Sequence, residues 1–223
     1  MEKLIGEDVQ KQLEEVFEAL VEPVQILFFS SKLRACEYCE HTWSLLEEVS
    51  ALSDKISLQG FDIDEDPDVA KRYHVELVPG IVIGVKKGDV VVDSGVRFAG
   101  IPAGHEFSSL INAIVLVSKQ DSGLGEESKA YLAELKEPVK LQVFVTTSCP
   151  YCPQAVTLAH QMALESENIQ AEMIEAVEFA ELSNSFGVSG VPHTVINHGK
   201  GEVVGAVPEG MLIDELKRAM KPA

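Results

Sequence analysis

The sequence predicts an α/β protein built from two similar units, each with a mixed central sheet flanked by helices on both faces. Three observations support this prediction. Apolar, strand-like runs alternate with helix-like segments along the whole chain. A cysteine pair, a Val-Pro dipeptide and their flanking residues occur twice. At 223 residues, the chain also has room for two domains of about 110 residues each.

The repeat is defined by its spacing. Three pairs of residues recur with a separation of 113: Cys36 and Cys149, Cys39 and Cys152, and Pro79 and Pro192. The flanks match as well, "EPVQILFFS" with "EPVKLQVFV" before the cysteines and "GIPAGHEFSSL" with "AVPEGMLIDEL" near the end of each half. Such matches indicate a duplication. The polar, glycine-containing stretch 118–128 marks the junction, so we expect one unit over residues 1–118 and a second over 119–223.

Each unit is expected to pass through the same elements in the same order. An opening helix precedes an apolar strand, and the cysteine pair and a second helix follow. Another strand, a short helix, a strand pair opened by Val-Pro and a final helix complete the unit. The expected bounds, first unit then second, are 7–21 and 126–136 for the opening helix, 24–29 and 140–145 for the first strand, 56–63 and 169–176 for the second strand, and 67–74 and 179–186 for the short helix.

The charge balance restricts the kinds of partner. The chain has 18 basic and 36 acidic residues, a net charge of −18, which argues against nucleic acid or an anionic membrane surface as the main partner. The apolar runs are too short for a membrane span, and the first 20 residues lack a secretory-signal pattern. We therefore expect a cytoplasmic protein. All four cysteines lie in the two pairs, which leaves none for a long-range disulfide framework.

In each unit the C-x-x-C segment is expected between the end of a strand and the start of a helix. There, unpaired backbone N–H groups and the helix dipole stabilise the thiolate of the first cysteine, whose pKa can fall to about 3.5–7.5. An exposed thiolate can attack a substrate disulfide, and the second thiol can resolve the mixed disulfide. Pro150 is expected in the first helical turn, with Pro153 one turn later producing a gentle kink. Zinc is the main alternative, but 109 residues separate Cys39 from Cys149 whereas zinc-ribbon knuckles are usually about 15–20 residues apart.

The two C-x-x-C segments, "CPYC" in the second unit and a Val-Pro in both units resemble the tandem thioredoxin-fold protein disulfide oxidoreductases, or glutaredoxin-like proteins, of thermophilic archaea and bacteria. The resemblance covers nearly the whole chain. Neither unit carries the Trp-Cys-Gly-Pro-Cys segment of thioredoxin or an acid in the strand before the cysteines.

This resemblance implies a thiol–disulfide oxidoreductase that reduces, forms or isomerises disulfides in protein substrates. It implies Cys36 and Cys149 as nucleophiles, with Cys39 and Cys152 as resolving thiols. The Val-Pro peptide bonds are expected to be cis and to lie beside the disulfides, and the implied substrate-binding residues are Val78, Pro79, Val191 and Pro192. No cofactor beyond the redox-active disulfides is expected, and the implied electron partner is a thioredoxin-reductase-like flavoenzyme.

The two centres differ at one position, because Glu37 stands where the second unit has Pro150. A carboxylate next to Cys36 disfavours its thiolate, so we expect Cys149 to be the more acidic thiol and the 36/39 pair to have the lower reduction potential. Two alternatives stay open. The chain could be a dedicated dithiol electron donor to a peroxidase or another reductase system, or a non-catalytic chaperone or zinc-binding scaffold.

Overall fold

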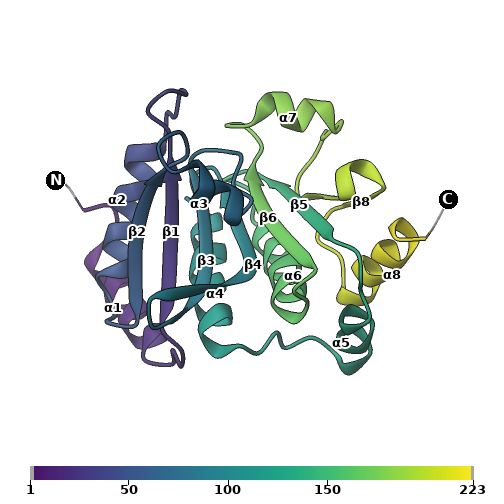
Figure 1. Ribbon diagram of the computed structural model, residues 1–223, viewed down its shortest axis with the longest axis horizontal. Coiled ribbons are helices and arrows are strands. Elements are labelled where there is room, and N and C mark those ends of the chain that lie inside the picture. Colours follow the sequence, from purple (N-terminus) through teal and green to yellow (C-terminus); the bar gives the residue numbers. More distant parts are fainter. Residues whose placement is uncertain (1–2, 222–223) are drawn as a thin grey trace.

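The computed structural model describes residues 3–221, and within them eight strands form one mixed sheet that runs through both units (Figure 1). The strand order across the sheet is β2-β1-β3-β4-β6-β5-β7-β8. The strands are β1 (Val24–Ser30), β2 (Ile56–Asp62), β3 (Gly80–Lys87), β4 (Val90–Ala99), β5 (Val139–Val145), β6 (Ile169–Glu175), β7 (His193–Ile196) and β8 (Gly201–Val204).

The helices follow the predicted order in both halves. They are α1 (Glu7–Phe17), α2 (Cys39–Ser50), α3 (Pro67–Arg72), α4 (Glu106–Lys119), α5 (Glu126–Ala133), α6 (Cys152–Glu165), α7 (Ala180–Ser185), the 3₁₀ turn η1 (Asn197–Gly199) and α8 (Glu209–Ala219). We call α1–α4 with β1–β4 the first unit and α5–α8 with β5–β8 the second. The boundary predicted after residue 118 stays a prediction, one residue short of the end of α4.

The two opening helices are shorter than predicted. α1 ends at Phe17 rather than residue 21, and α5 ends at Ala133 rather than residue 136. Pro23 and Pro138 follow within a few residues, and a proline disfavours helical backbone in the residue before it. Each chain segment therefore leaves the helix early and enters β1 or β5 in an extended conformation.

Helices cover both faces of the sheet, as predicted. On β1, Ile26 and Phe28 pack into a large apolar core with α1, α2 and α4, while Leu27 and Phe29 pack on the opposite face around α3. This alternation follows from the two-residue period of a strand. The large core continues into the second unit, where it includes residues of α6 and α8, and α7 packs on the other face with Phe144.

The two units are joined through the sheet itself. β4 pairs with β6 in parallel from Val96 opposite Ala171 to Ala99 opposite Ile174, and α4 packs on α6. β1, β4, β6 and β5 all point the same way, so the C-x-x-C segments that follow β1 and β5 lie at the same edge of the sheet. The end of β6 is therefore placed next to the first unit's site. Within residues 3–221, no helix is both long and apolar enough to cross a bilayer.

Candidate active site: two disulfide centres and a pocket at the unit junction

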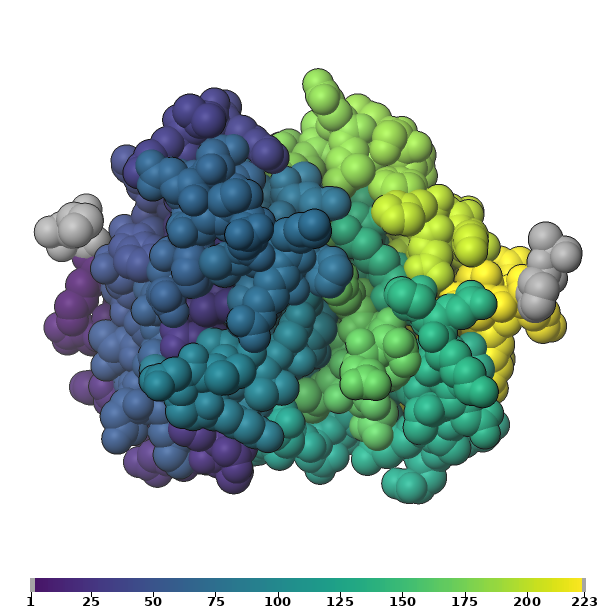
Figure 2. Space-filling view, viewed as in Figure 1, coloured from purple at the N-terminus to yellow at the C-terminus, as the bar shows by residue number. Residues whose placement is uncertain are grey.

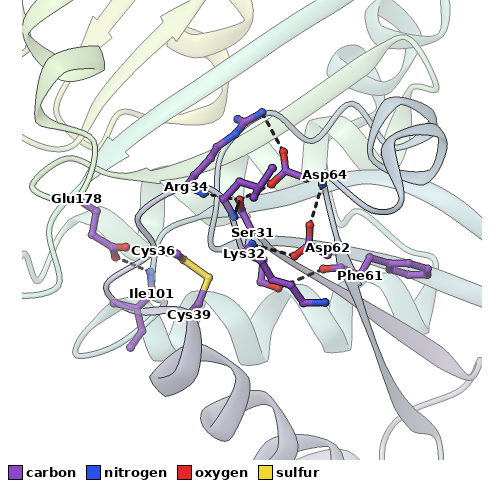
Figure 3. Close-up of a disulfide and its surroundings, with 12 residues drawn as sticks. Ser31, Lys32, Arg34, Cys36, Cys39, Phe61, Asp62, Asp64, Ile101 and Glu178 are labelled. Atoms are coloured by element: carbon purple, nitrogen blue, oxygen red, sulfur yellow. Dashed lines mark hydrogen bonds and ion pairs between the residues drawn. A yellow bond between two sulfur atoms is a disulfide. The ribbon is translucent and has the colours of Figure 1, made fainter.

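The first centre lies in the loop between β1 and α2. Cys36 and Cys39 form a disulfide with their Cα atoms 5.4 Å apart, and α2 begins at Cys39 (Figure 3). Both cysteines are partly exposed. The preceding loop is held by Asp62 at the end of β2, whose carboxylate accepts hydrogen bonds from the N–H groups of Lys32 and Asp64, at 2.9 Å each. The disulfide is thus presented by a braced loop at the start of a helix.

The second centre has the same arrangement with a different degree of exposure. Cys149 and Cys152 form a disulfide with a Cα separation of 5.5 Å, and α6 begins at Cys152. Contrary to the expectation of an exposed nucleophile, Cys149 is only 8% exposed. Its Sγ accepts a hydrogen bond from the Cys152 N–H at 3.2 Å. An N–H group in this position stabilises a thiolate when the disulfide is reduced.

The prolines of the second centre lie earlier in the helix than predicted. Pro150 precedes α6 instead of falling in its first turn, because the helix begins at the second cysteine. Pro153 is the second residue of α6, where no intrahelical hydrogen bond to its nitrogen is needed. Pro153 therefore fits the helix start, and the predicted kink one turn further in is wrong.

Both Val-Pro peptide bonds are cis, between Val78 and Pro79 and between Val191 and Pro192. Each lies beside its disulfide: Val78 and Pro79 line a pocket with Cys36, and the Val191 carbonyl oxygen is 3.9 Å from the Sγ of Cys149. The structure thus brings the predicted substrate-binding residues to the cysteines in both units. That they pair with a substrate peptide stays a prediction.

The proline carbonyls are held in the same way in both units. Gly100 donates its N–H to the Pro79 carbonyl at 2.9 Å, and Gly205 donates to the Pro192 carbonyl at 2.7 Å. Both glycines have left-handed backbone, with φ of +92° and +91°. The surroundings differ, because a Cβ on Gly100 would lie 2.6 Å from the Glu175 Cβ and 2.8 Å from Glu178 Oε1, whereas one on Gly205 would meet nothing within 4 Å.

A pocket of about 680 Å³ opens beside the first disulfide, between the two units. Figure 2 shows an indentation at the top of the molecule, between the purple segment of the first unit and the light-green segment of the second. We call it the junction pocket, and its walls include Cys36, Glu37, Pro79, Ser148, Glu175 and Glu178. Sequence reasoning within one repeat did not find Glu175 and Glu178, because they reach this site from the other unit.

Glu178 is the most perturbed group in the junction pocket. Burial raises the pKa of its carboxyl group to about 7, with Glu175 and Glu37 adding to the shift and the hydrogen bond from Ile101 opposing it. That bond runs from the Ile101 N–H to Glu178 Oε1 at 2.6 Å (Figure 3). Glu175, at the end of β6, accepts the N–H groups of Val177 and Glu178 and so shapes the turn that presents Glu178.

Another buried acid lies near the second centre. Glu106 is the first residue of α4 and is fully buried, and burial raises the pKa of its carboxyl group to about 7, against a hydrogen bond from the Ser109 hydroxyl at 2.6 Å. The preceding residue, His105, donates its N–H to the carbonyl of Thr147, two residues before Cys149. Sequence reasoning missed Glu106. The signal was in the repeat, where "GIPAGHEFSSL" aligned with "AVPEGMLIDEL" sets Glu106 against Leu212.

The sites are equipped for two-electron thiol chemistry. Each has a disulfide that can open to a dithiol and a helix N-terminus next to the first sulfur. In the part of the chain that the structure describes, no three His, Cys, Asp or Glu side chains gather as a metal-binding group.

Comparison with known proteins agrees with this chemistry. A thioredoxin domain model matches residues 139–218, which covers the sheet of the second unit and its cysteine pair. Two thioredoxin-fold units, each with a C-x-x-C disulfide next to a cis-proline, define the class of thiol–disulfide oxidoreductases.

The crystal structure of a protein disulfide oxidoreductase from Aeropyrum pernix superposes with a TM-score of 0.86 and 33% identity, over 95% of this chain and 92% of that one. The chain therefore belongs to the family of tandem protein disulfide oxidoreductases. The N-terminal domain of the alkyl hydroperoxide reductase AhpF of Enterococcus faecalis is also similar, with a TM-score of 0.85 and 27% identity over 94% of this chain and 98% of that one.

The curated relatives are longer proteins. The alkyl hydroperoxide reductase AhpF of Staphylococcus aureus is 26% identical over 194 residues, which is 87% of this chain and 34% of the relative. The Pseudomonas aeruginosa protein of the same name is 26% identical over 202 residues, or 91% and 35%. This chain thus spans about a third of the length of these relatives.

Proposed function

We propose that the chain exchanges electrons with disulfides of protein substrates, which it reduces, forms or isomerises, through both C-x-x-C centres. The observation that carries this proposal is the recurrence of one constellation, a disulfide at a helix start beside a cis Val-Pro, in both units. In this proposal Cys36 and Cys149 are the nucleophiles and Cys39 and Cys152 resolve. The backbone at Val78 and Val191 pairs with an extended substrate, and Pro79 and Pro192 shape its groove.

In the reductive direction, the Cys149 thiolate attacks one sulfur of the substrate disulfide and releases the other as a thiolate. The Cys152 thiol loses its proton and attacks Cys149 Sγ in the mixed disulfide, which releases the second substrate thiolate. Two electrons and two protons pass to the substrate, and the centre is left as the disulfide. Cys149 is favoured as the primary nucleophile because its Sγ accepts the Cys152 N–H, while Glu37 and Glu178 stand near Cys36.

Regeneration needs a second redox partner. We propose a thioredoxin-reductase-like flavoenzyme, since the centres hold only two electrons each and must be reduced again after each turnover.

The test is insulin reduction by the parent chain, Cys36→Ser, Cys149→Ser and the double variant, with dithiothreitol as reductant. We expect each single variant to lose one centre and the double variant to fall to the rate with no protein. The Cys149→Ser variant should lose more. If the double variant keeps full activity in an aggregation assay and the parent reduces nothing, the chain is a chaperone and the proposal is wrong.

A second candidate is a dithiol donor to a peroxide-reducing enzyme. It is favoured by the similarity to the alkyl hydroperoxide reductase AhpF, which extends over nearly the whole chain. Reduced chain should then be oxidised faster by a cysteine-based peroxidase with an alkyl hydroperoxide than by insulin. Omitting the peroxidase controls for direct oxidation, and a faster reaction with insulin would contradict this candidate.

A further inference from the structure

The junction pocket is an acidic cavity beside one of the two disulfides. Three carboxyl groups line it, those of Glu37, Glu175 and Glu178, and no lysine, arginine or histidine of the described residues joins them in the lining. Cys36 and the cis-proline Pro79 form the neighbouring wall. A residue that flanks the reacting sulfur of a substrate at Cys36 would therefore meet these carboxyl groups.

Glu178 is placed to act on such a residue. It is half-buried, its carboxyl group accepts one backbone N–H from Ile101, and no lysine or arginine lies within ion-pair distance of it among the described residues. In Figure 3 its carboxylate points toward Ile101 on the side of Cys36. A carboxylate held away from water without a cation is destabilised, so an incoming ammonium or guanidinium group gains more here than at an exposed acid.

The charged groups that face Glu178 all have the same sign. Glu37 approaches from the loop before α2, and Glu175 from the end of β6. The walls contributed by the β5–α6 loop and the β4–α4 connection are uncharged: Thr146, Thr147, Ser148, Ile101 and Ala103. Burial, Glu175 and Glu37 together place the pKa of Glu178 at about 7, so its charge develops across neutral pH.

The second centre lacks a counterpart of this wall within residues 3–221. β8 is the edge strand, so no strand of the described sheet stands beside it as β6 stands beside β4. Gly205, which corresponds to Gly100, has open space where Gly100 meets Glu175 and Glu178. Pro150 replaces Glu37. The acidic pocket is therefore a property of the Cys36 centre and arises from its place in the middle of the joined sheet.

We propose that the junction pocket binds a lysine or arginine side chain next to the reacting cysteine of a polypeptide substrate, and that Glu178 of the second unit is the specificity-determining residue. The inference rests on the proposed function, since it concerns the substrate of the same site. Electrostatic complementarity of this kind selects partners and speeds their encounter.

The experiment compares two synthetic peptide disulfides that differ only in the residue after cysteine, lysine in one and glutamine in the other. Pre-reduced Cys149→Ser/Cys152→Ser protein, with the Cys36 centre alone, should prefer the lysine peptide in kcat/KM by roughly three- to tenfold, the range expected for one partly shielded ion pair. The ratio is measured on one protein sample, so a loss of active protein cancels. Cys36→Ser/Cys39→Ser protein should show a ratio near one.

Glu178→Gln in the single-centre protein should bring the ratio close to one, whereas Glu181→Gln, an exposed carboxylate on α7 outside the pocket, should leave it unchanged. The ratio should also rise from pH 6 to pH 8 in the parent as Glu178 ionises, and stay flatter in Glu178→Gln.

Equal rates for the two peptides at the Cys36 centre, or an equal loss of preference in Glu181→Gln, would overturn this inference and leave the proposed function standing. If neither single-centre protein reduces either peptide, the proposed function itself fails.

Discussion

The two disulfide centres share one local design and differ in what surrounds them. Both have a C-x-x-C disulfide at a helix start and a cis Val-Pro whose carbonyl is held by a glycine N–H. The Cys36 centre faces a pocket walled by the other unit, and the Cys149 centre lies beside the sheet edge with a nearly buried first cysteine. A duplicated motif thus acquires two environments from the order in which the units join one sheet.

The largest effect is expected at the glycine pair. Gly205→Ala should cost about 1–2 kcal/mol of stability, because alanine at a left-handed φ is strained. Gly100→Ala should cost about 1–3 kcal/mol more, because its Cβ would also collide with Glu175. The free energy of unfolding from denaturant titration of both oxidised variants measures the difference.

Because the two positions have almost the same φ, Gly205→Ala is a matched control for backbone strain. Equal losses in the two variants would mean that the end of β6 moves aside without cost, and that the junction pocket is not held closely against the first unit.

The glycine pair also shows how far the sequence reaches. Alternating strand and helix patterns and the 113-residue spacing predict both units and both cysteine sites, since these depend on local periodicity and on the repeat. The pairing of β4 with β6 leaves no such periodic signal. It depends on which sheet edges meet, and so the placement of Glu178 against Ile101 was beyond prediction.

The next effect concerns Glu106, which replaces the buried Leu212 of the second unit. Burial raises the pKa of Glu106 to about 7 from an ordinary 4.5, so the folded protein holds this proton more tightly than the unfolded chain. Its contribution to stability is complete below pH 4.5 and is lost as the pH rises through 7, by about 3 kcal/mol.

Glu106→Gln stays neutral at every pH and should therefore be more stable than the parent at pH 8, by up to about 3 kcal/mol, and similar to it at pH 5. Denaturant titrations at both pH values measure this, with the exposed Glu181→Gln as the control. A parent and variant that lose equal stability between pH 5 and pH 8 would show that Glu106 does not hold its proton in the fold.

The smallest effect is expected at Glu37 and Pro150. A carboxylate beside Cys36 destabilises its thiolate and hence the reduced form, so the 36/39 pair should have the lower reduction potential. Glu37→Gln should raise that potential and Pro150→Glu should lower that of the 149/152 pair, each by about 30 mV or less, because both positions are exposed. The measurement is equilibration of each single-centre protein with a dithiothreitol redox buffer, followed by alkylation of free thiols. Glu178 stays near Cys36 in Glu37→Gln, so part of the gap between the centres should survive the substitution. Equal potentials in the two parent centres, or the reverse order, would mean that exposure of the sulfurs outweighs the neighbouring charges.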